Sequence, residues 1–312
     1  MLPTVIASSV IRSTHRGDSH GGIYRINLET EDVKQMFDWD NPNINWEGRG
    51  GDRGVRGLAF FGHTFYAVAG NELFAFEQDG DSLKLVASYP NIYLKLTHEA
   101  WRYRDKLYIC SGGTNCILVF DLVKKGWTTS YYHTQFSAGS KSFDPNDPCF
   151  YPKVNEGNTQ FHLDSVYADD NFLWYCGAHT DGIWRMDLNT KQTIKIPLQI
   201  GDTHNARPYR DGYLYNLSRY SKTIFERNGR ILKEWMTPNN DPSTLIYTNL
   251  PKDCAVQGYT RGMVTYDNFI ITGTSPAAIN VFSFGDGPDM VKSIQLTNDI
   301  RNSICGMALY EW

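Results

Sequence analysis

One pattern occurs six times along this 312-residue chain: a short apolar run, a polar turn of Asp, Arg, Asn or Gly, and then an aromatic-rich strand. The copies begin at residues 59, 101, 166, 207, 263 and 307, and the last copy ends with the chain. Six copies share 312 residues, an average of about 52 each. A period of this length is typical of folds built from repeated structural units.

Each of the first five copies contains four strand-like segments. In the copy that begins at 166, residues 173–176 and 183–188 supply the second and third segments. The fourth segment is often rich in Lys, which suits an outer edge strand that must not pair with other molecules. Aromatic residues make up 14% of the chain, and with 27 Gly they favour short strands and tight turns over helices. Four antiparallel strands per copy form one blade of a β-propeller.

The incomplete ends of the chain complement each other. Residues 5–11, 22–28 and 33–39 supply a second, third and fourth strand but no first strand, whereas residues 304–309 supply only a first strand. Pairing the two ends closes the ring and removes two exposed sheet edges. We therefore predict an all-β chain, a six-bladed β-propeller that forms a single domain over residues 1–312. A seventh blade within residues 133–160 is the structural alternative, and the prolines of that segment argue against it.

Charge and hydropathy exclude several partners. The net charge of −4 carries no basic footprint for nucleic acid. No apolar run approaches the roughly 18 residues of a membrane span, and the first residues lack the basic and apolar regions of a signal peptide. Six cysteines in a chain this long do not form a disulfide scaffold, so we expect reduced thiols and a cytoplasmic protein.

Three connections are unusually long, and all of them lead into the first strand of a predicted blade: 40–55, 133–160 and 236–258. In a propeller, such connections emerge together on one face, which we call the top face. Long loops on one side of a rigid scaffold usually carry function.

Alignment of the copies places one residue of each first strand at the mouth of the central channel. Two residues before each copy stand Gly57, Glu99, Asp164, Asn205, Arg261 and Cys305. The preceding positions include Arg56, His98 and His204, and His162 lies one step further back in its own copy.

The oxygen donors Glu99, Asp164 and Asn205 would suit a hard divalent cation such as calcium, magnesium or manganese. Adding His162, with His98 and His204 nearby, gives a mixed set that suits zinc, iron or manganese. The alternative is a water-filled tunnel lined by these polar groups. We predict a divalent metal ion held by Glu99, Asp164, Asn205 and His162.

This arrangement resembles the calcium-dependent six-bladed propellers of the SMP-30/gluconolactonase and paraoxonase-type lactonases. In those families Glu, Asn and Asp hold the ion, and the resemblance implies that Glu99, Asp164 and Asn205 hold it here. The in-register pair His98 and His204 departs from that pattern. The resemblance implies lactonase-like hydrolysis.

Further polar residues belong to the same face. His179 lies in a second-to-third-strand turn and either caps that turn or acts as a general base or substrate contact. Arg56 and Arg261 either clamp a carboxylate, phosphate or sulfate, or form ordinary loop salt bridges. Cys305 is either a nucleophile beside His98 or His204 or a small packed residue.

We predict a metal-dependent enzyme that acts on a small polar, anionic metabolite at the top of the channel. Hydrolase (lactonase-like), lyase and isomerase chemistry all fit a metal ion, a proton-moving histidine and an anion-binding arginine. The predicted catalytic residues are His98, His204, His179, Arg56 and Arg261. The partner is a small-molecule substrate, with no nucleic acid and no membrane. The alternative is a non-catalytic propeller that binds a peptide or glycan on the same face.

Overall fold

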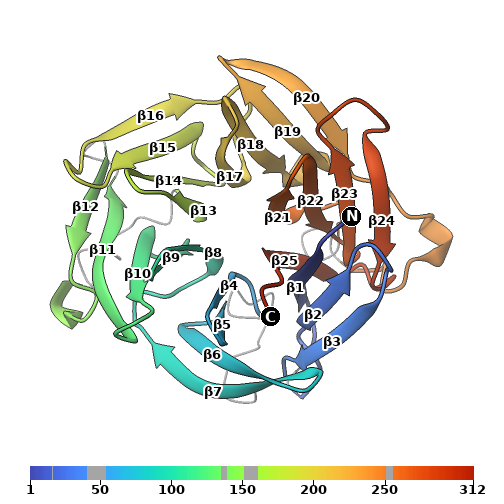
Figure 1. Ribbon diagram of the computed structural model, residues 1–312, viewed down its shortest axis with the longest axis horizontal. Helices are drawn as coiled ribbons and strands as arrows, with labels where there is room; N and C mark the ends of the chain where they lie inside the picture. Colours follow the sequence, from blue (N-terminus) through green and yellow to red (C-terminus); the bar gives the residue numbers. More distant parts are fainter. Residues whose placement is uncertain (16, 41–53, 135–138, 151–160, 251–255) are drawn as a thin grey trace.

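A computed structural model describes residues 1–15, 17–40, 54–134, 139–150, 161–250 and 256–312. Among these residues the strands form six antiparallel sheets, arranged as a ring around a central axis (Figure 1). The chain is a six-bladed β-propeller, as the repeats predicted. None of the described helices is long and apolar enough to cross a membrane.

The blades follow the chain in order. Blade 1 contains β25 (Asn302–Leu309), β1 (Thr4–Ile11), β2 (Gly22–Asn27) and β3 (Val33–Asp38). Blade 2 contains β4 (Leu58–Phe61), β5 (Thr64–Ala69), β6 (Glu72–Asp79) and β7 (Ser82–Pro90). Blade 3 contains β8 (Thr97–Tyr103), β9 (Lys106–Ser111), β10 (Cys116–Asp121), β11 (Gly126–Thr134) and β12 (Gly139–Phe143).

The second half of the ring repeats this order. Blade 4 contains β13 (Leu163–Ala168), β14 (Phe172–Gly177), β15 (Gly182–Asp187) and β16 (Thr193–Pro197). Blade 5 contains β17 (His204–Tyr209), β18 (Gly212–Leu217), β19 (Lys222–Arg227) and β20 (Arg230–Met236). Blade 6 contains β21 (Arg261–Tyr266), β22 (Phe269–Thr274), β23 (Ala278–Ser283) and β24 (Met290–Gln295). The short 3-10 turns are η1 (Pro148–Phe150), η2 (Ser218–Tyr220) and η3 (Pro242–Thr244).

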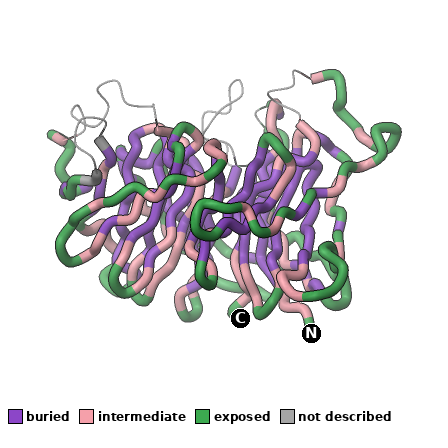
Figure 2. The backbone as a smooth tube through the Cα atoms, turned by 90° about the horizontal axis from the view of Figure 1, so that it is seen from above, coloured by how far each residue is buried: buried purple, intermediate pink, exposed green. Residues whose placement is uncertain are grey.

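The ring closes where the sequence predicted it. Strand β25 pairs antiparallel with β1, from Val5 opposite Leu309 to Ile11 opposite Asn302. The two termini lie at the same end of the molecule (Figure 2). Because β25 runs toward the C-terminus, its first residues lie at the opposite end, which is the top face.

Blade 3 differs from the prediction by one strand. β12 pairs with the outer edge of β11, so this sheet has five strands in the described part of the chain. Its sequence, Gly-Ser-Lys-Ser-Phe, carries one apolar side chain and therefore lacks the alternation that marks a half-buried strand. No seventh blade is formed by the described residues of 133–160.

The hydrophobic core is divided among the interfaces between blades. The described buried residues form six clusters, and each cluster joins two neighbouring blades. Between blades 5 and 6, for example, Phe225 and Trp235 pack against Ile270 and Phe282. Both faces of a blade are therefore covered, and a middle strand such as β10 is buried along its whole length.

Irregular pairing marks the beginning of the innermost strands. In the described structure the register shifts between Thr97 and Ala100 in β8, and between Leu163 and Ser165 in β13. Similar shifts occur in β17, in β21 and where β25 passes Ser8 and Ser9 of β1. A bulge turns two successive side chains of one strand toward the same side. The bulges coincide with the positions that the aligned copies placed at the channel mouth.

Candidate functional site

Three histidines from three blades meet at the top of the channel. Nε2 of His98 lies 3.0 Å from Nε2 of His162, and the ring centroids of His98 and His204 are 6.3 Å apart. Each ring comes from the start of an innermost strand or the residue just before it, where the bulges lie. The structure thus brings together three of the predicted site histidines.

The contacts of His98 fix which of its ring nitrogens carries the proton. Nη1 of Arg56 lies 3.4 Å from Nδ1 of His98 and can only donate, so this nitrogen accepts. In the neutral ring the proton is then on Nε2 of His98, which donates to Nε2 of His162. His162 must therefore carry its own proton on Nδ1.

His204 is held by a second network. The hydroxyl of Ser218 donates to the carbonyl of Thr260 at 2.7 Å, so at 3.0 Å it accepts from Nδ1 of His204. Nε2 of His204 then faces two groups: Nη2 of Arg261 at 3.0 Å and Oδ2 of Asp164 at 3.1 Å. The single lone pair of Nε2 accepts from Arg261, and within the described structure Oδ2 of Asp164 has no hydrogen-bond partner.

Burial favours the uncharged forms of Asp164 and His204. The Asp164 side chain is fully inaccessible, and burial raises its pKa well above the ordinary value, against the opposing effect of Arg261. Burial and the charge of Arg261 lower the pKa of His204 well below its ordinary value. Burial thus favours the protonated carboxyl of Asp164 and the neutral ring of His204.

All three imidazoles are neutral. Burial, followed by the charges of Arg56 and Arg261, lowers the pKa of His98 well below its ordinary value. Burial and the same two arginines lower the pKa of His162 to about 4. The guanidiniums thus impose a positive potential on the top of the channel, and this potential disfavours a further cation.

Glu99 is neutralised by a residue that the sequence analysis did not single out. Nη2 of Arg207 lies 2.6 Å from Oε1 of Glu99, and the Asn205 amide donates to the same oxygen at 3.0 Å. The backbone N–H of Val166 donates to Oε2 at 3.0 Å. Burial raises the pKa of Glu99, and these three donors offset part of that effect. A charged Arg207 at a position where other copies carry Ala, Trp, Val or Met was the available signal.

The four predicted metal ligands do not form a metal centre here. Asn205 presents its amide nitrogen to Glu99, and its own oxygen accepts from Asn216 at 3.1 Å. His162 directs Nε2 to His98. Among the described residues, no group of three or more His, Cys, Asp or Glu side chains is arranged to hold a metal ion. The donor set does not fit a divalent cation, and the metal ion stays a prediction without structural support.

The remaining predicted residues lie around this cluster. The ring centroid of His179 is 6.5 Å from that of His162, and His179 is exposed. Arg261 donates to the Tyr259 hydroxyl at 3.1 Å. Cys305 is buried and contacts the Ser303 hydroxyl at 3.6 Å. The five described cysteines are free thiols, and Cys254 lies outside the described residues.

The thiol of Cys305 experiences the same positive potential. Burial alone raises the pKa of Cys305, but the charges of Arg56, Arg261 and Arg12 outweigh burial and lower it. No described histidine contacts the sulfur, so the dyad with His98 or His204 is not formed in this structure.

Comparisons with known proteins show the fold. No protein-family model matches the chain, and no curated protein matches it in sequence. A solved chain of a nidogen/laminin complex is 10% identical, with 97% of both chains covered and a TM-score of 0.60. A putative 6-phosphogluconolactonase from Bacteroides fragilis is 12% identical, covering 95% of this chain and 82% of that one, with a TM-score of 0.52.

A second protein described in the same way, from Bacteroides uniformis, is 11% identical, covering 96% of this chain and 84% of that one, with a TM-score of 0.53. Identities this low establish a shared propeller architecture and leave the chemistry to the residues of the site. The predicted resemblance to lactonase-type propellers is confirmed at the level of the fold.

Proposed function

We propose that this propeller is an enzyme that acts on a small anionic metabolite at the top of its channel. The observation that carries the proposal is the contact between Arg56 and His98, beside His162 and Arg261. Buried neutral imidazoles accept protons, and adjacent guanidiniums bind carboxylate or phosphate. The site therefore combines a base with an anion-binding group.

The geometry suggests how substrate binding activates the base. Arg56 to His98 is the longest hydrogen bond of the network, at 3.4 Å. A substrate anion that engages Arg56 frees Nδ1 of His98 to accept a proton. His98 then passes its Nε2 proton to Nε2 of His162, 3.0 Å away. The negative charge of the substrate also offsets the positive charge of the arginines and raises the pKa of His98 and His162 toward neutral pH.

The site suits reactions that need a general base and an anion-binding group: lactone hydrolysis, elimination by a lyase, and isomerisation. In lactone hydrolysis the base takes a proton from water as the water oxygen attacks the carbonyl, and the protonated base then gives a proton to the ring oxygen as the C–O bond breaks. In a lyase or isomerase the base removes a carbon-bound proton. The two Bacteroides neighbours are named for a phosphorylated lactone, so phosphorylated and carboxylated lactones are the first substrates to assay. No step is assigned to the predicted metal ion, because the donor set does not fit one.

Calorimetry with inorganic phosphate tests the anion site. The wild type should bind phosphate, and Arg261→Gln should weaken binding about 10- to 100-fold, since a hydrogen bond to a charged group contributes about 1.5–3 kcal/mol. Arg227→Gln is the matched control, because Arg227 forms an ion pair with exposed Asp211 and contacts none of the site histidines in the described structure. Equal affinity in both variants would contradict the proposal.

Assays of lactone hydrolysis test the base. His98→Gln should abolish turnover of any lactone that the wild type hydrolyses, whereas His63→Gln, in an exposed turn, should not. A protein that binds a peptide or glycan on this face but neither binds phosphate nor turns over any substrate would favour the non-catalytic alternative.

A further inference from the structure

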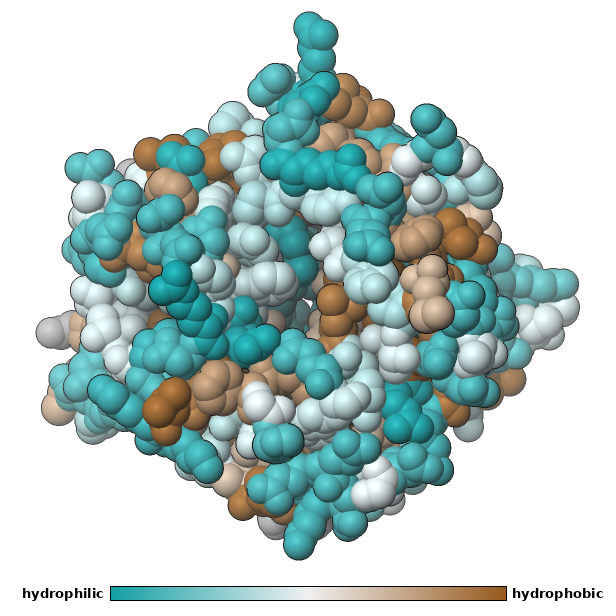
Figure 3. All heavy atoms as spheres, viewed as in Figure 1, coloured by the Kyte–Doolittle hydropathy of each residue, from teal (hydrophilic) through white to brown (hydrophobic). Residues whose placement is uncertain are grey.

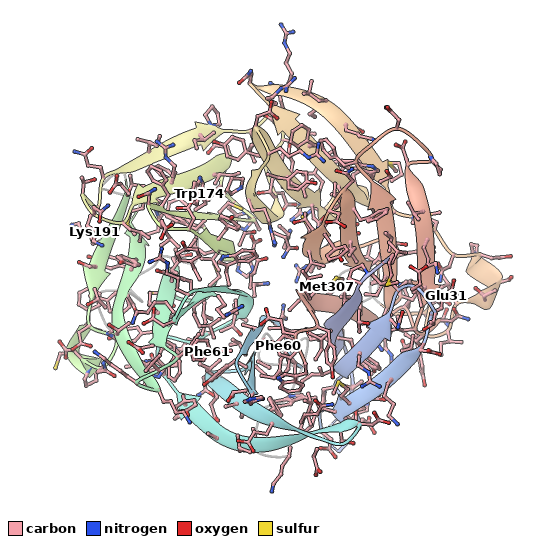
Figure 4. The ribbon with its side chains drawn as sticks, in the orientation of Figure 1. Glu31, Phe60, Phe61, Trp174, Lys191 and Met307 are labelled. Atoms are coloured by element: carbon pink, nitrogen blue, oxygen red, sulfur yellow. The ribbon has the colours of Figure 1, made fainter. Side chains whose placement is uncertain are left out.

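A cavity occupies the channel on the side of the bulges away from the histidines. Its volume is about 240 Å³, and it is enclosed by the innermost strands of the ring. Glu99, Asn205 and Cys305 form its inner end, and its walls include Phe60, Met263 and Met307. Phe60 and Met307 lie on β4 and β25 near the axis (Figure 4). None of the three site histidines lines it.

The cavity opens on the face that carries the termini. Along β25 and the tail, Cys305 and Met307 are buried (8% and 9% exposed), Leu309 is half-buried and Glu311 is exposed. Glu311 lines the cavity and forms an ion pair with Arg102 at 3.0 Å. Figure 3, drawn in the orientation of Figure 1, shows that the molecular surface is hollowed near the axis. A small molecule can therefore enter without passing the top face.

The inner end of the cavity offers a hydrogen-bond donor, Arg207, and an acceptor, Glu99, whose charges cancel. Arg207 uses Nη2 for Glu99 and Nε for the carbonyl of Asn205, and its guanidinium lies 5.0 Å from the Trp101 ring centroid. Within the described structure, Nη1 of this buried arginine makes no hydrogen bond. Oε2 of Glu99 accepts one bond, from Val166, and retains capacity for a second.

We propose that this cavity is a second ligand site, for a small uncharged amphiphile with an amide or hydroxyl head and an apolar chain. The head accepts from Arg207 and donates to Glu99, whose opposite charges cancel, and the chain packs against Phe60 and Met307. At ~30 Å³ per water-sized group, the volume accommodates roughly eight non-hydrogen atoms. Hexanamide has this size. The site is independent of the proposed activity at the top face.

A homologous series of probes tests the proposal on the wild-type protein. From butanamide to hexanamide, calorimetric affinity should rise about fourfold per methylene, as expected for burial of apolar surface, and should level off beyond the cavity length. Hexanoate and hexylammonium should bind at least tenfold more weakly than hexanamide. Affinity that is absent, independent of chain length, or highest for a charged head would overturn the proposal.

A filled cavity provides the matched comparison. Met307→Trp should abolish hexanamide binding, whereas Met290→Trp, which adds the same ring at an exposed position, should not. If Met307→Trp fails to fold, thiol labelling of the wild type replaces it. Hexanamide should slow the reaction of methyl methanethiosulfonate with Cys305, which lines the cavity, and should leave exposed Cys149 unaffected. Equal rates at Cys305 with and without hexanamide would refute the site.

Discussion

Single residues at the top of the channel owe their protonation to burial and to neighbouring guanidiniums. His98 accepts from Arg56 and donates to His162, so the two rings form a directed pair with one defined tautomer each. The Ser218 hydroxyl accepts from Nδ1 of His204 and so fixes the proton of that ring on Nδ1. These rings are available as bases at neutral pH because none of them is charged.

A histidine away from the site provides a clean test of the cost of burial. His133 lies between blades 3 and 4 with Nδ1 3.1 Å from the Tyr175 hydroxyl, and burial lowers its pKa to about 4. In the unfolded chain the pKa returns to about 6.5, so between these values the unfolded state binds more protons. The stability from neutral His133 is complete above pH 6.5 and falls as the pH drops toward 4.

Urea unfolding at pH 7.0 and pH 4.5 measures this effect. The advantage of wild type over His133→Gln should shrink by about 2–3 kcal/mol between the two pH values. The matched variant at exposed His63, His63→Gln, should track the wild type at both. Parallel pH dependence of wild type and His133→Gln would show that the folded-state pKa is ordinary.

Glu99 yields a prediction about metal removal. Because Arg207 and Asn205 balance its carboxylate, dialysis against EDTA should change neither the melting temperature nor the phosphate affinity. Elemental analysis before and after dialysis, together with calorimetry, checks this. A stoichiometric metal ion that is lost in Glu99→Gln but kept in Glu77→Gln, at an exposed position, would restore the calcium-type site.

Alignment of the repeats could predict which residues converge but not which of them pair. Glu99, Asp164, Asn205 and Arg261 follow from one position per copy, and backbone register alone brings them to the axis. Pairing depends on the charge and length of the side chains, and Arg207 lies two residues after Asn205 on β17. A long cation can reach a carboxylate on another blade, here Glu99 of β8, which strand periodicity does not predict.

At the scale of strands, the bulges determine where functional side chains lie. Regular alternation would direct His98 and Glu99 to opposite faces of β8, whereas the register shift between Thr97 and Ala100 lets both contribute to the channel region. Asn205 adopts a left-handed backbone conformation (φ 56°) within the β17 irregularity. These bulges explain why two successive positions of one copy, such as His98 and Glu99, both reach the channel region.

The bulge of β25 requires a glycine. A Cβ on Gly306 would lie 1.7 Å from the carbonyl oxygen of Arg56, to which the Ser8 hydroxyl also donates at 2.7 Å. Gly306→Ala should therefore lower the free energy of unfolding by at least about 3 kcal/mol and weaken phosphate binding by displacing Arg56.

Gly126→Ala is the control for that variant. Its nearest neighbour would be 4.0 Å away, so the effect on stability should stay within about 0.5 kcal/mol. Chemical unfolding of both variants and phosphate calorimetry give the comparison. Wild-type stability in Gly306→Ala would mean that β25 does not approach Arg56 this closely.

Strand prediction succeeded where apolar residues are regular and failed where they are not. The boundaries of β1, β2 and β3 were predicted to within about one residue, because each has a buried face and a polar turn beside it. β12 was missed because backbone pairing to β11, rather than an apolar face, places it in the sheet.

At the scale of the whole molecule, stability resides between blades. Each of the six clusters among the described residues needs side chains from two neighbours, so a single blade buries no core of its own. Loss of one blade would expose two interfaces. The ring should therefore unfold as one cooperative unit.

Ring closure can be tested by moving the ends of the chain. Deleting residues 302–312 removes β25 and exposes β1, so this truncation should not give a folded monomer. A circular permutant with the termini joined by a flexible linker, opened at the exposed turn Asn228–Gly229, should keep the wild-type circular dichroism spectrum and one unfolding transition. A folded, monomeric truncation would show that the β1–β25 pairing is dispensable.

The bulged strands separate two parts of the protein that can change independently. The register shifts of the innermost strands fix the positions of His98 and His204, whereas the long top-face connections lie outside these strands. Loop grafting onto this scaffold should therefore alter what binds at the top face and leave His98 and His204 in place. A change of substrate would therefore begin with the long connections of the top face.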